Sequence, residues 1–425
     1  MDMDAASILE RTAGVTAPLR RPARALVARA EAGAAAAVAR VADVDVLRGF
    51  VIVLMALDHV RHYFHSGSPG VDPLDPAQTT PLLYATRWIT HLCAPTFVLL
   101  AGVSAYLQLA RGKTPARLAR FLLTRGLWLV ALELTAVSFG WSFSFPYPFF
   151  LQVIWAIGWS MVALAALVRL PRAAVLAVGV AIVAGHDLLD PLVPEQFGRL
   201  GLLWQLLHEG GPIFIGGRPI GAASYPVLPW IGVIALGFGL GPWLARPAAK
   251  GDGRLSAGLA MLAAFAVLRG FDLYGDAVQW QPLWTRTASA MSFFDVTKYP
   301  PSLDYVLVTL GLVLVLWPAL SRLRGPAATF FRTFGAVPMF FYLAHLYLIH
   351  GLDIVANAAA GRDVTPLFGY VANTYLRPET LHGLGFGLPT VYAAWLLVLA
   401  ALYPLCRWFG GVKARRRDVW WLSYL

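Results

Sequence analysis

Residues Asp45–His65 read DVLRGFVIVLMALDHVRHYFH, an apolar stretch of membrane-spanning length with an arginine near its start and histidines near its end. Arg48 and His59 are eleven positions apart, which in an α-helix is three turns plus about 20°. Their side chains therefore share one face and lie about 16 Å apart along the helix axis. A cation and an imidazole on one face predict that a single ligand is contacted at two depths.

The composition is that of a membrane protein. Of the 425 residues, 58% are hydrophobic and 13% are charged, whereas soluble proteins carry about 25% charged residues. So little polar surface cannot cover a globule, and we predict an all-α integral membrane protein. The net charge of +11 is not interpreted as a nucleic-acid surface, because the aromatic residues do not alternate with basic patches in polar segments.

About ten apolar segments are each able to span a bilayer, which takes about 20 residues. If the N-terminus lies inside, most of the 34 Lys and Arg residues fall on the inner side. This distribution predicts an even number of crossings with both termini cytoplasmic, in a cell (plasma) membrane. The predicted segments lie near residues 46–64, 88–110, 118–140, 149–169, 172–189, 226–245, 255–272, 303–321, 332–352 and 385–408.

Three regions follow from this pattern. Residues 1–42 lack the continuous apolar run of a signal peptide and are predicted to form a poorly ordered cytoplasmic tail. Residues 43–410 form the transmembrane domain, and residues 411–425 form a basic cytoplasmic tail. The predicted outer loops are long and rich in Trp, Tyr, Pro and Gly, which favours a lid or a binding site on that side.

The outer end of the first apolar segment carries a polar cluster. An Asp or His within a membrane helix is costly and marks a functional site by default, so Asp58, His59 and His65 are candidate catalytic residues. Asp58 can reach His62 one turn later or orient an imidazole. The alternative is a polar cluster that only hydrogen-bonds neighbouring helices. A metal site on the three histidines is disfavoured, since steps of three residues spread their rings around the helix.

Other polar residues allow two interpretations. His91 and Arg87 are predicted to support the site or contact a substrate; the alternative for His91 is a helix-end histidine bonded to a carbonyl group. Lys298 is either a substrate contact or an interfacial anchor. His345 and His350 are interpreted in the same way as Lys298, with the anchoring role favoured.

Two further groups favour structural roles. Glu133 is the acidic residue deep within the third segment, and we expect it to form an ion pair with a cation such as Arg125, with a proton relay as the alternative. Cys93 and Cys406 have no metal-binding spacing and are predicted to stay unpaired. No metal is predicted.

Several motifs resemble the heparan-α-glucosaminide N-acetyltransferase-like membrane family, within the wider superfamily of transmembrane acyltransferases. The arginine and histidine of the first segment have the spacing of the superfamily motif. The likeness extends over most of the chain and rests on the blocks Leu47–His59, Arg87–Gly102, Tyr225–Gly232, Lys298–Leu303 and Phe340–His345.

The resemblance implies an enzyme that passes an acyl group from cytosolic acyl-CoA, in this family acetyl-CoA, to an extracytoplasmic glycan or amino sugar. Arg48 would then bind or position the CoA. His59 matches the catalytic histidine of the superfamily, whereas His65 best matches the histidine that the glucosaminide acetyltransferases place slightly later. Both transfers are kept. The partners expected are the lipid bilayer, acyl-CoA and the acceptor, without nucleic acid, and a homodimer is left open.

Histidine suits this chemistry, because acyl transfer from a thioester needs a base for the attacking hydroxyl or amine. A histidine is also able to carry the acyl group covalently, and the sequence does not choose between the two routes. The alternative function is a secondary transporter or flippase, which would place carboxylates near mid-depth and broken helices in matching halves. A third class, a membrane assembly factor, would need neither Arg48 nor His59.

Overall fold

A computed structural model describes residues 21–67, 70–246, 251–416 and 418–424. The chain is mostly helical. The longer helices are α2 (Arg21–Phe64), α4 (Cys93–Ala110), α5 (Pro115–Leu132), α7 (Val153–Leu167), α8 (Arg172–Gly185), α10 (Val227–Gly239), α12 (Arg254–Gly270), α14 (Leu303–Ser321), α15 (Gly325–Gly335), α16 (Pro338–Ala359) and α18 (Leu388–Arg415).

Each of the ten predicted segments overlaps one of these helices. Within the described residues, six helical stretches are long and apolar enough to cross a membrane, which makes this a multi-pass membrane protein. Helices α7 and α10 are apolar but shorter, and α2 carries charged residues within its apolar half. The number of ten crossings and the cytoplasmic termini stay predictions. The six stretches are Pro81–Ala110, Pro115–Ser142, Arg172–Leu189, Leu303–Ser321, Pro338–Ala359 and Leu388–Arg415.

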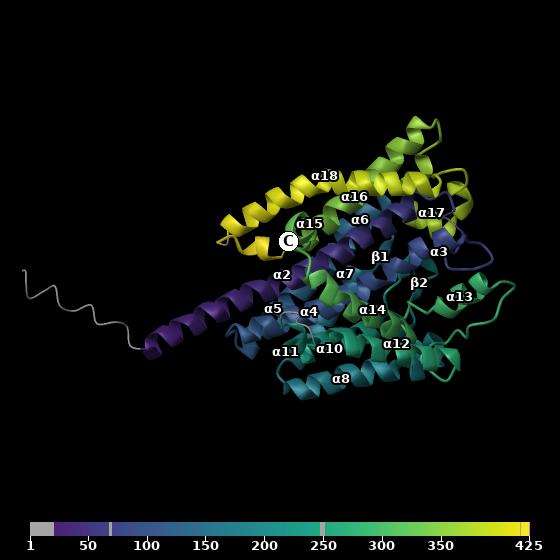
Figure 1. Ribbon diagram of the computed structural model, residues 1–425. Helices are drawn as coiled ribbons and strands as arrows, with labels where there is room; N and C mark the ends of the chain where they lie inside the picture. Colours follow the sequence, from purple (N-terminus) through teal and green to yellow (C-terminus); the bar gives the residue numbers. More distant parts are fainter. Residues whose placement is uncertain (1–20, 68–69, 247–250, 417, 425) are drawn as a thin grey trace, which may run out of the picture.

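Helix α2 is the central element of the bundle. It contacts α4, α14, α15, α16 and α18. Figure 1 shows it running through the middle of the molecule, with α18 along one side and α8 along the opposite side. Its first half, which includes residues 21–42 of the predicted tail, extends beyond the other helices. The remainder of that tail, residues 1–20, lies outside the described residues.

A close glycine contact fixes α2 against α15. A Cβ atom at Gly49 would lie 1.8 Å from the carbonyl oxygen of Phe331, and one at Gly335 would lie 1.9 Å from that of Asp45. Both positions thus need glycine for the helix backbones to approach, as is common where membrane helices pack. Because Gly49 follows Arg48, this contact also fixes the position of the Arg48 backbone.

A small sheet corrects the all-α prediction. Strand β3 (Arg218–Ala223) pairs in parallel with β1 (Phe149–Leu151) and antiparallel with β2 (Gly211–Ile215). The hairpin between β2 and β3 turns at Gly216 and Gly217, which both have positive φ that glycine adopts at low cost. The predicted helical segment 149–169 therefore begins as a strand, and the loop before α10 is partly ordered as a hairpin.

The glycine contact predicts a specific loss of stability. Gly49→Ala places a methyl group against the backbone of α15, so the two helices must separate, at a cost of about 1–3 kcal/mol. We expect a lower unfolding temperature for the purified variant in detergent. The matched control is Gly351→Ala in α16, where the new Cβ meets no atom within 4 Å. Equal unfolding temperatures for the two variants would contradict the close contact.

Candidate active site

A cavity of about 660 Å³ lies at the end of α2 that carries the histidines. The hairpin of β2 and β3, the segment before α14 and the end of α2 contribute to its walls. The cavity, called the outer cavity below, brings together most of the residues that the sequence singled out. The predicted residues in its lining are Asp58, His59, Arg87, His91 and Lys298.

His59 is hydrogen-bonded to a second histidine. Its Nδ1 lies 2.7 Å from Nε2 of His345 in α16, and Nδ1 of His345 lies 3.0 Å from the carbonyl oxygen of Phe341. A carbonyl only accepts, so His345 carries its proton on Nδ1, and its Nε2 accepts from His59 when both rings are neutral. The Nε2 atom of His59 then holds a lone pair. The geometry thus leaves His59 with one nitrogen able to act as a base or nucleophile.

Aromatic rings enclose the His59 imidazole. The Trp141 ring meets it edge-on at 5.1 Å between centroids, and the Tyr342 ring does so at 6.2 Å. Trp141 lines the outer cavity, whereas Tyr342 lines a second cavity on the other side. His59 is only 9% exposed; it lines the outer cavity, and the adjacent Tyr342 ring lines the second cavity. The rings of His59, Trp141 and Tyr342 are called the His59 layer below.

Asp58 is held between two arginines. Its carboxylate accepts from Nη2 of Arg61 at 3.2 Å and from Nη1 of Arg87 at 3.1 and 3.2 Å. The expected contact of Asp58 with His62 is not formed, because both carboxylate oxygens face the guanidinium groups. Arg87 comes from α3 (Pro81–Trp88), so its ion pair with Asp58 joins α3 to α2 beside the cavity.

His91 and Lys298 are both buried in the wall of the outer cavity. Within the described residues, neither ring nitrogen of His91 has a hydrogen-bond partner, which argues against the carbonyl-bonded alternative. The ammonium group of Lys298 lies 5.1 Å from the Tyr299 ring and 5.8 Å from the Tyr225 ring. Both residues therefore present polar groups toward the cavity.

His65 lies apart from this arrangement. It follows the last residue of α2, its Nδ1 accepts a hydrogen bond from the backbone of Gly67 at 3.1 Å, and its backbone pairs with Phe386. It is not among the described residues that line either cavity. The structure thus places His59, and not His65, between the cavities, and the catalytic role of each stays a prediction.

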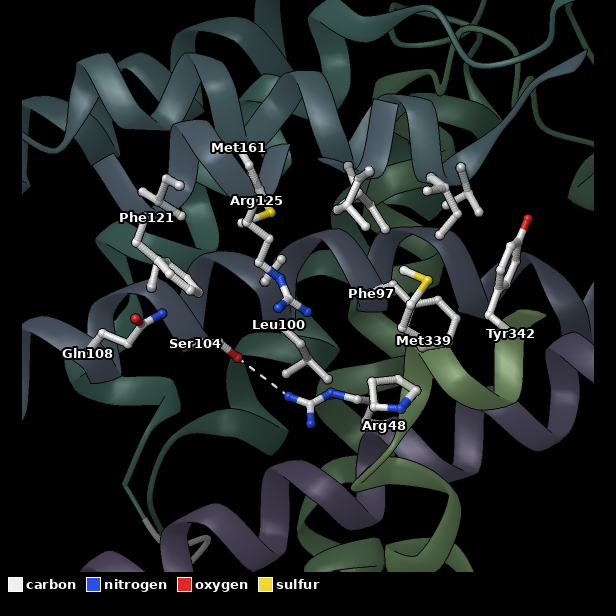
Figure 2. A pocket seen from close by; sticks show the side chains of 18 of the residues that line it. Arg48, Phe97, Leu100, Ser104, Gln108, Phe121, Arg125, Met161, Met339 and Tyr342 are labelled. Carbon is white, nitrogen blue, oxygen red and sulfur yellow. Dashed lines mark hydrogen bonds between the residues drawn. The ribbon is translucent and has the colours of Figure 1, made fainter. Parts of the chain in front are cut away.

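The second cavity, called the inner cavity, has a volume of about 280 Å³ and surrounds Arg48. Figure 2 shows Arg48 and Arg125 directed into it, with Gln108 toward one end and Tyr342 at the other. Lys413 of α18 is the third cation in the lining, and no carboxylate is found among the described lining residues. In Figure 2 the apolar side chains of Phe97 and Met339 lie between Arg48 and Tyr342.

Arg48 is fixed by three contacts. One terminal nitrogen donates to Asp45 at 2.8 Å and to the Gly335 carbonyl at 3.0 Å, while the other lies 3.4 Å from the Ser104 hydroxyl. The side chain is one-fifth exposed, so it retains access to the cavity. The sequence predicts that Arg48 and His59 contact one ligand at two depths. In the structure Arg48 lines the inner cavity and His59 lines the outer cavity.

Carboxylates stand at the rim of the outer cavity. Asp72, Glu209 and Asp295 are in its lining. Burial and the nearby Asp72 raise the pKa of Asp295 to about 6, although Arg269 acts in the opposite direction. The cavity is therefore cationic near α2 and acidic toward the opposite wall.

Glu133 has a structural partner that the sequence interpretation missed. Its carboxylate accepts from the backbone amides of Gln152 at 2.9 Å and Trp155 at 3.2 Å, at the start of α7. The expected ion pair with Arg125 is wrong. A buried carboxylate at a helix N-terminus satisfies amides that have no partner within the helix, and a π-helical turn over Glu133–Val137 directs the side chain to that point.

Sequence reasoning also missed His345, Trp141 and Tyr342 as neighbours of His59. His345 was assigned an interfacial role, yet it is fully buried. A histidine flanked by aromatic residues within an apolar helix was the signal available. Its depth relative to His59 is set by packing of helices distant in the sequence.

Comparison with known proteins places this multi-pass membrane protein among the acetyltransferases. The family model of the heparan-alpha-glucosaminide N-acetyltransferase catalytic domain matches residues 40–270, which is more than half of the chain, and the protein belongs to this family. No curated protein matches the sequence. The match includes Arg48, His59 and His91, whereas Lys298 and His345 lie beyond it.

The cap at Glu133 predicts a graded effect of substitution. Glu133→Ala leaves two buried amides without acceptors, each costing about 1–3 kcal/mol, whereas Glu133→Gln keeps one acceptor oxygen. We expect unfolding temperatures in detergent to fall in the order wild type, Gln, Ala, with the Gln variant retaining acetyltransferase activity. A Gln variant of full stability but without activity would instead support the proton relay.

Proposed function

We propose that this membrane acetyltransferase transfers an acetyl group from cytosolic acetyl-CoA, held in the inner cavity, to an acceptor in the outer cavity. The single observation that carries the proposal is the position of His59 between the two cavities. Family membership supplies the reaction class. The inward orientation of the Arg48 end follows the predicted topology.

The inner cavity suits the donor. Its lining holds the three cations Arg48, Arg125 and Lys413, which would neutralise the phosphate groups of CoA, and arginine is able to bind phosphate oxygens by two parallel hydrogen bonds. The apolar stretch beyond them suits the uncharged arm that leads to the thioester. The thioester would then reach the layer formed by Tyr342 and His59.

The hydrogen-bond order at His59 supports its role. The acceptor hydroxyl or amine must lose a proton as it attacks the thioester carbonyl, and Nε2 of His59 is the nitrogen left with a lone pair. The bond from Nδ1 to His345 would stabilise the imidazolium that forms, as a positioned partner does in other histidine-based sites. CoA leaves as the thiol after taking up that proton, whether transfer is direct or through an acetyl-histidine.

The outer cavity suits a polar acceptor. It is larger than the inner cavity and is lined by Arg87, Lys298 and the rim carboxylates. These groups provide both donors and acceptors for the hydroxyl and amine groups of a glycan or amino sugar. His91, whose two ring nitrogens have no hydrogen-bond partner among the described residues, would be a further contact for such a group.

His59→Ala should abolish transfer while leaving the fold intact. The variant lacks the base, so we expect CoA release from acetyl-CoA, with glucosamine as the acceptor probe, to fall by about 10²–10⁴-fold. His65→Ala should retain most of the activity, because His65 lies outside both cavities. The measurement is thiol release by purified protein in detergent. The opposite ranking of the two variants would transfer the role to His65.

The exposed His382 provides a control, and His382→Ala should behave as wild type.

Two variants of His345 test its hydrogen bond to His59. His345→Gln keeps an acceptor for Nδ1 of His59, whereas His345→Leu does not, so the Gln variant should retain more activity and shift the pH profile less. Equal losses in both variants would show that His345 acts only through packing.

Arg48→Ala should weaken donor binding. Loss of a charge-assisted contact to phosphate costs about 1.5–3 kcal/mol, so we expect the KM for acetyl-CoA to rise by at least tenfold with little change in the KM for glucosamine. Arg111→Ala is the control, since Arg111 is exposed and absent from the described lining of the inner cavity. A rise confined to the KM for glucosamine would place the donor elsewhere.

A further inference from the structure

A second cluster of polar side chains lies at the far end of α8. His186 and Asp190 are one helical turn apart, and His208 approaches them from η5 (Gln205–Glu209). One ring nitrogen of each imidazole and one carboxylate oxygen of Asp190 all lie within 4.8 Å of one another. Both histidines are 2% exposed, and the acetyl-transfer site uses none of the three residues.

The protonation of His186 is fixed by its surroundings. Its Nε2 lies 3.0 Å from the Pro301 carbonyl oxygen, so this nitrogen carries the proton of the neutral ring. Nδ1 then has a lone pair, is buried, and makes no hydrogen bond within the described residues. It lies 3.3 Å from a carboxylate oxygen of Asp187. Two electron-rich atoms this close call for a positive charge between or beside them.

His208 is held in the same manner. Its Nε2 lies 2.9 Å from the carbonyl oxygen of His186 and 3.6 Å from Oδ1 of Asp190, so the neutral ring carries its proton on Nε2 and its Nδ1 holds the lone pair for a ligand. The Trp204 ring stacks on the imidazole at 5.1 Å with an interplanar angle of 3°. Backbone carbonyls that orient imidazoles are the usual second partners of metal-binding histidines. The two rings are therefore set in position before any ligand arrives.

An acidic cavity of about 320 Å³ adjoins the cluster. Asp187 and Asp190 line it together with Asp272, Asp276 and Asp304, against one cation, Arg269. Asp304 is 1% exposed, and its Oδ1 has no hydrogen-bond partner within the described residues. The negative potential of this cavity would attract a cation to the side of Asp187 and Asp190.

We propose that His186, Asp190 and His208 bind one divalent cation of the zinc class. Two imidazole nitrogens and one carboxylate oxygen are a ligand set that Zn²⁺ favours, whereas Ca²⁺ and Mg²⁺ prefer oxygen ligands alone. Water or Asp187 completes the coordination. A proton alone would satisfy one ring, but the metal satisfies both imidazoles and the carboxylate together.

The site would act as a structural clamp. His186 is bonded to Pro301, and Asp187 accepts from the backbone of Leu303 at 3.0 Å, so the cluster is tied to the segment that precedes α14. That segment also carries Lys298 of the outer cavity. A bound metal would therefore fix one wall of the outer cavity without taking part in acetyl transfer.

Metal content tests the proposal directly. The purified full chain, stripped with EDTA and then equilibrated with ZnCl₂, should retain one zinc per chain by elemental analysis. His186→Gln, Asp190→Asn and His208→Gln should each lower zinc affinity by at least about tenfold. EDTA should lower the unfolding temperature of the wild type but not of these variants.

His382→Gln and Asp363→Asn, at exposed positions, are the matched controls and should bind zinc as the wild type does. If a variant of His186, Asp190 or His208 fails to fold, Co²⁺ added to the wild type gives a second readout. Co²⁺ bound by these ligands absorbs visible light, and this absorption is lost when Zn²⁺ displaces the Co²⁺. Absence of stoichiometric zinc in the wild type, or zinc retained by all three folded variants, would overturn the proposal. The result is independent of acetyl transfer, which is measured by CoA release.

Discussion

The hydrogen bond between His59 and His345 determines how the rest of the site is organised. It joins α2 to α16 at 2.7 Å, and it works only because the Phe341 carbonyl fixes the proton on the far nitrogen of His345. Because His345 is fully buried and His59 is 9% exposed, water competes little with these bonds, and the chain of bonds has one preferred order. Everything proposed about transfer depends on the lone pair that this order leaves on His59.

The burial of charged side chains explains why the charges of α2 are paired. Arg48 is bound by Asp45, and Asp58 is bound by Arg61 and Arg87. A charge that is removed from water without a partner costs several kcal/mol. Each ion pair lowers this cost for the two charged residues that form it. The helix can therefore carry Arg48 and Asp58, beside the imidazole of His59, in one apolar span.

Periodicity alone predicted the relation between Arg48 and His59, because their spacing in one helix fixes a shared face. The length of the apolar runs placed the ten segments, each of which overlaps a helix, although segment 149–169 begins as strand β1. Neither feature could predict His345, which is 286 positions from His59, since the match of two helices in depth depends on packing. Glu133 was assigned to the wrong partner for a similar reason: the sequence offered a nearby cation, whereas the fold offered two helix-start amides. The histidines of the proposed metal site are separated by a loop whose path the sequence does not specify.

Two cavities with a histidine between them impose a constraint on the reaction. In the proposed reaction, donor and acceptor would be separated by the layer of His59, Trp141 and Tyr342, so neither would need to cross the bundle. Arg48 and His59 are about 16 Å apart along α2, a distance that a flexible thioester arm can extend across while its phosphates stay with the cations. Only the acetyl group then has to pass the layer. The histidine that could receive it is His59, whose hydrogen bond from Nδ1 to His345 leaves the lone pair on Nε2. The acetyl-CoA side and the acceptor side would then stay apart.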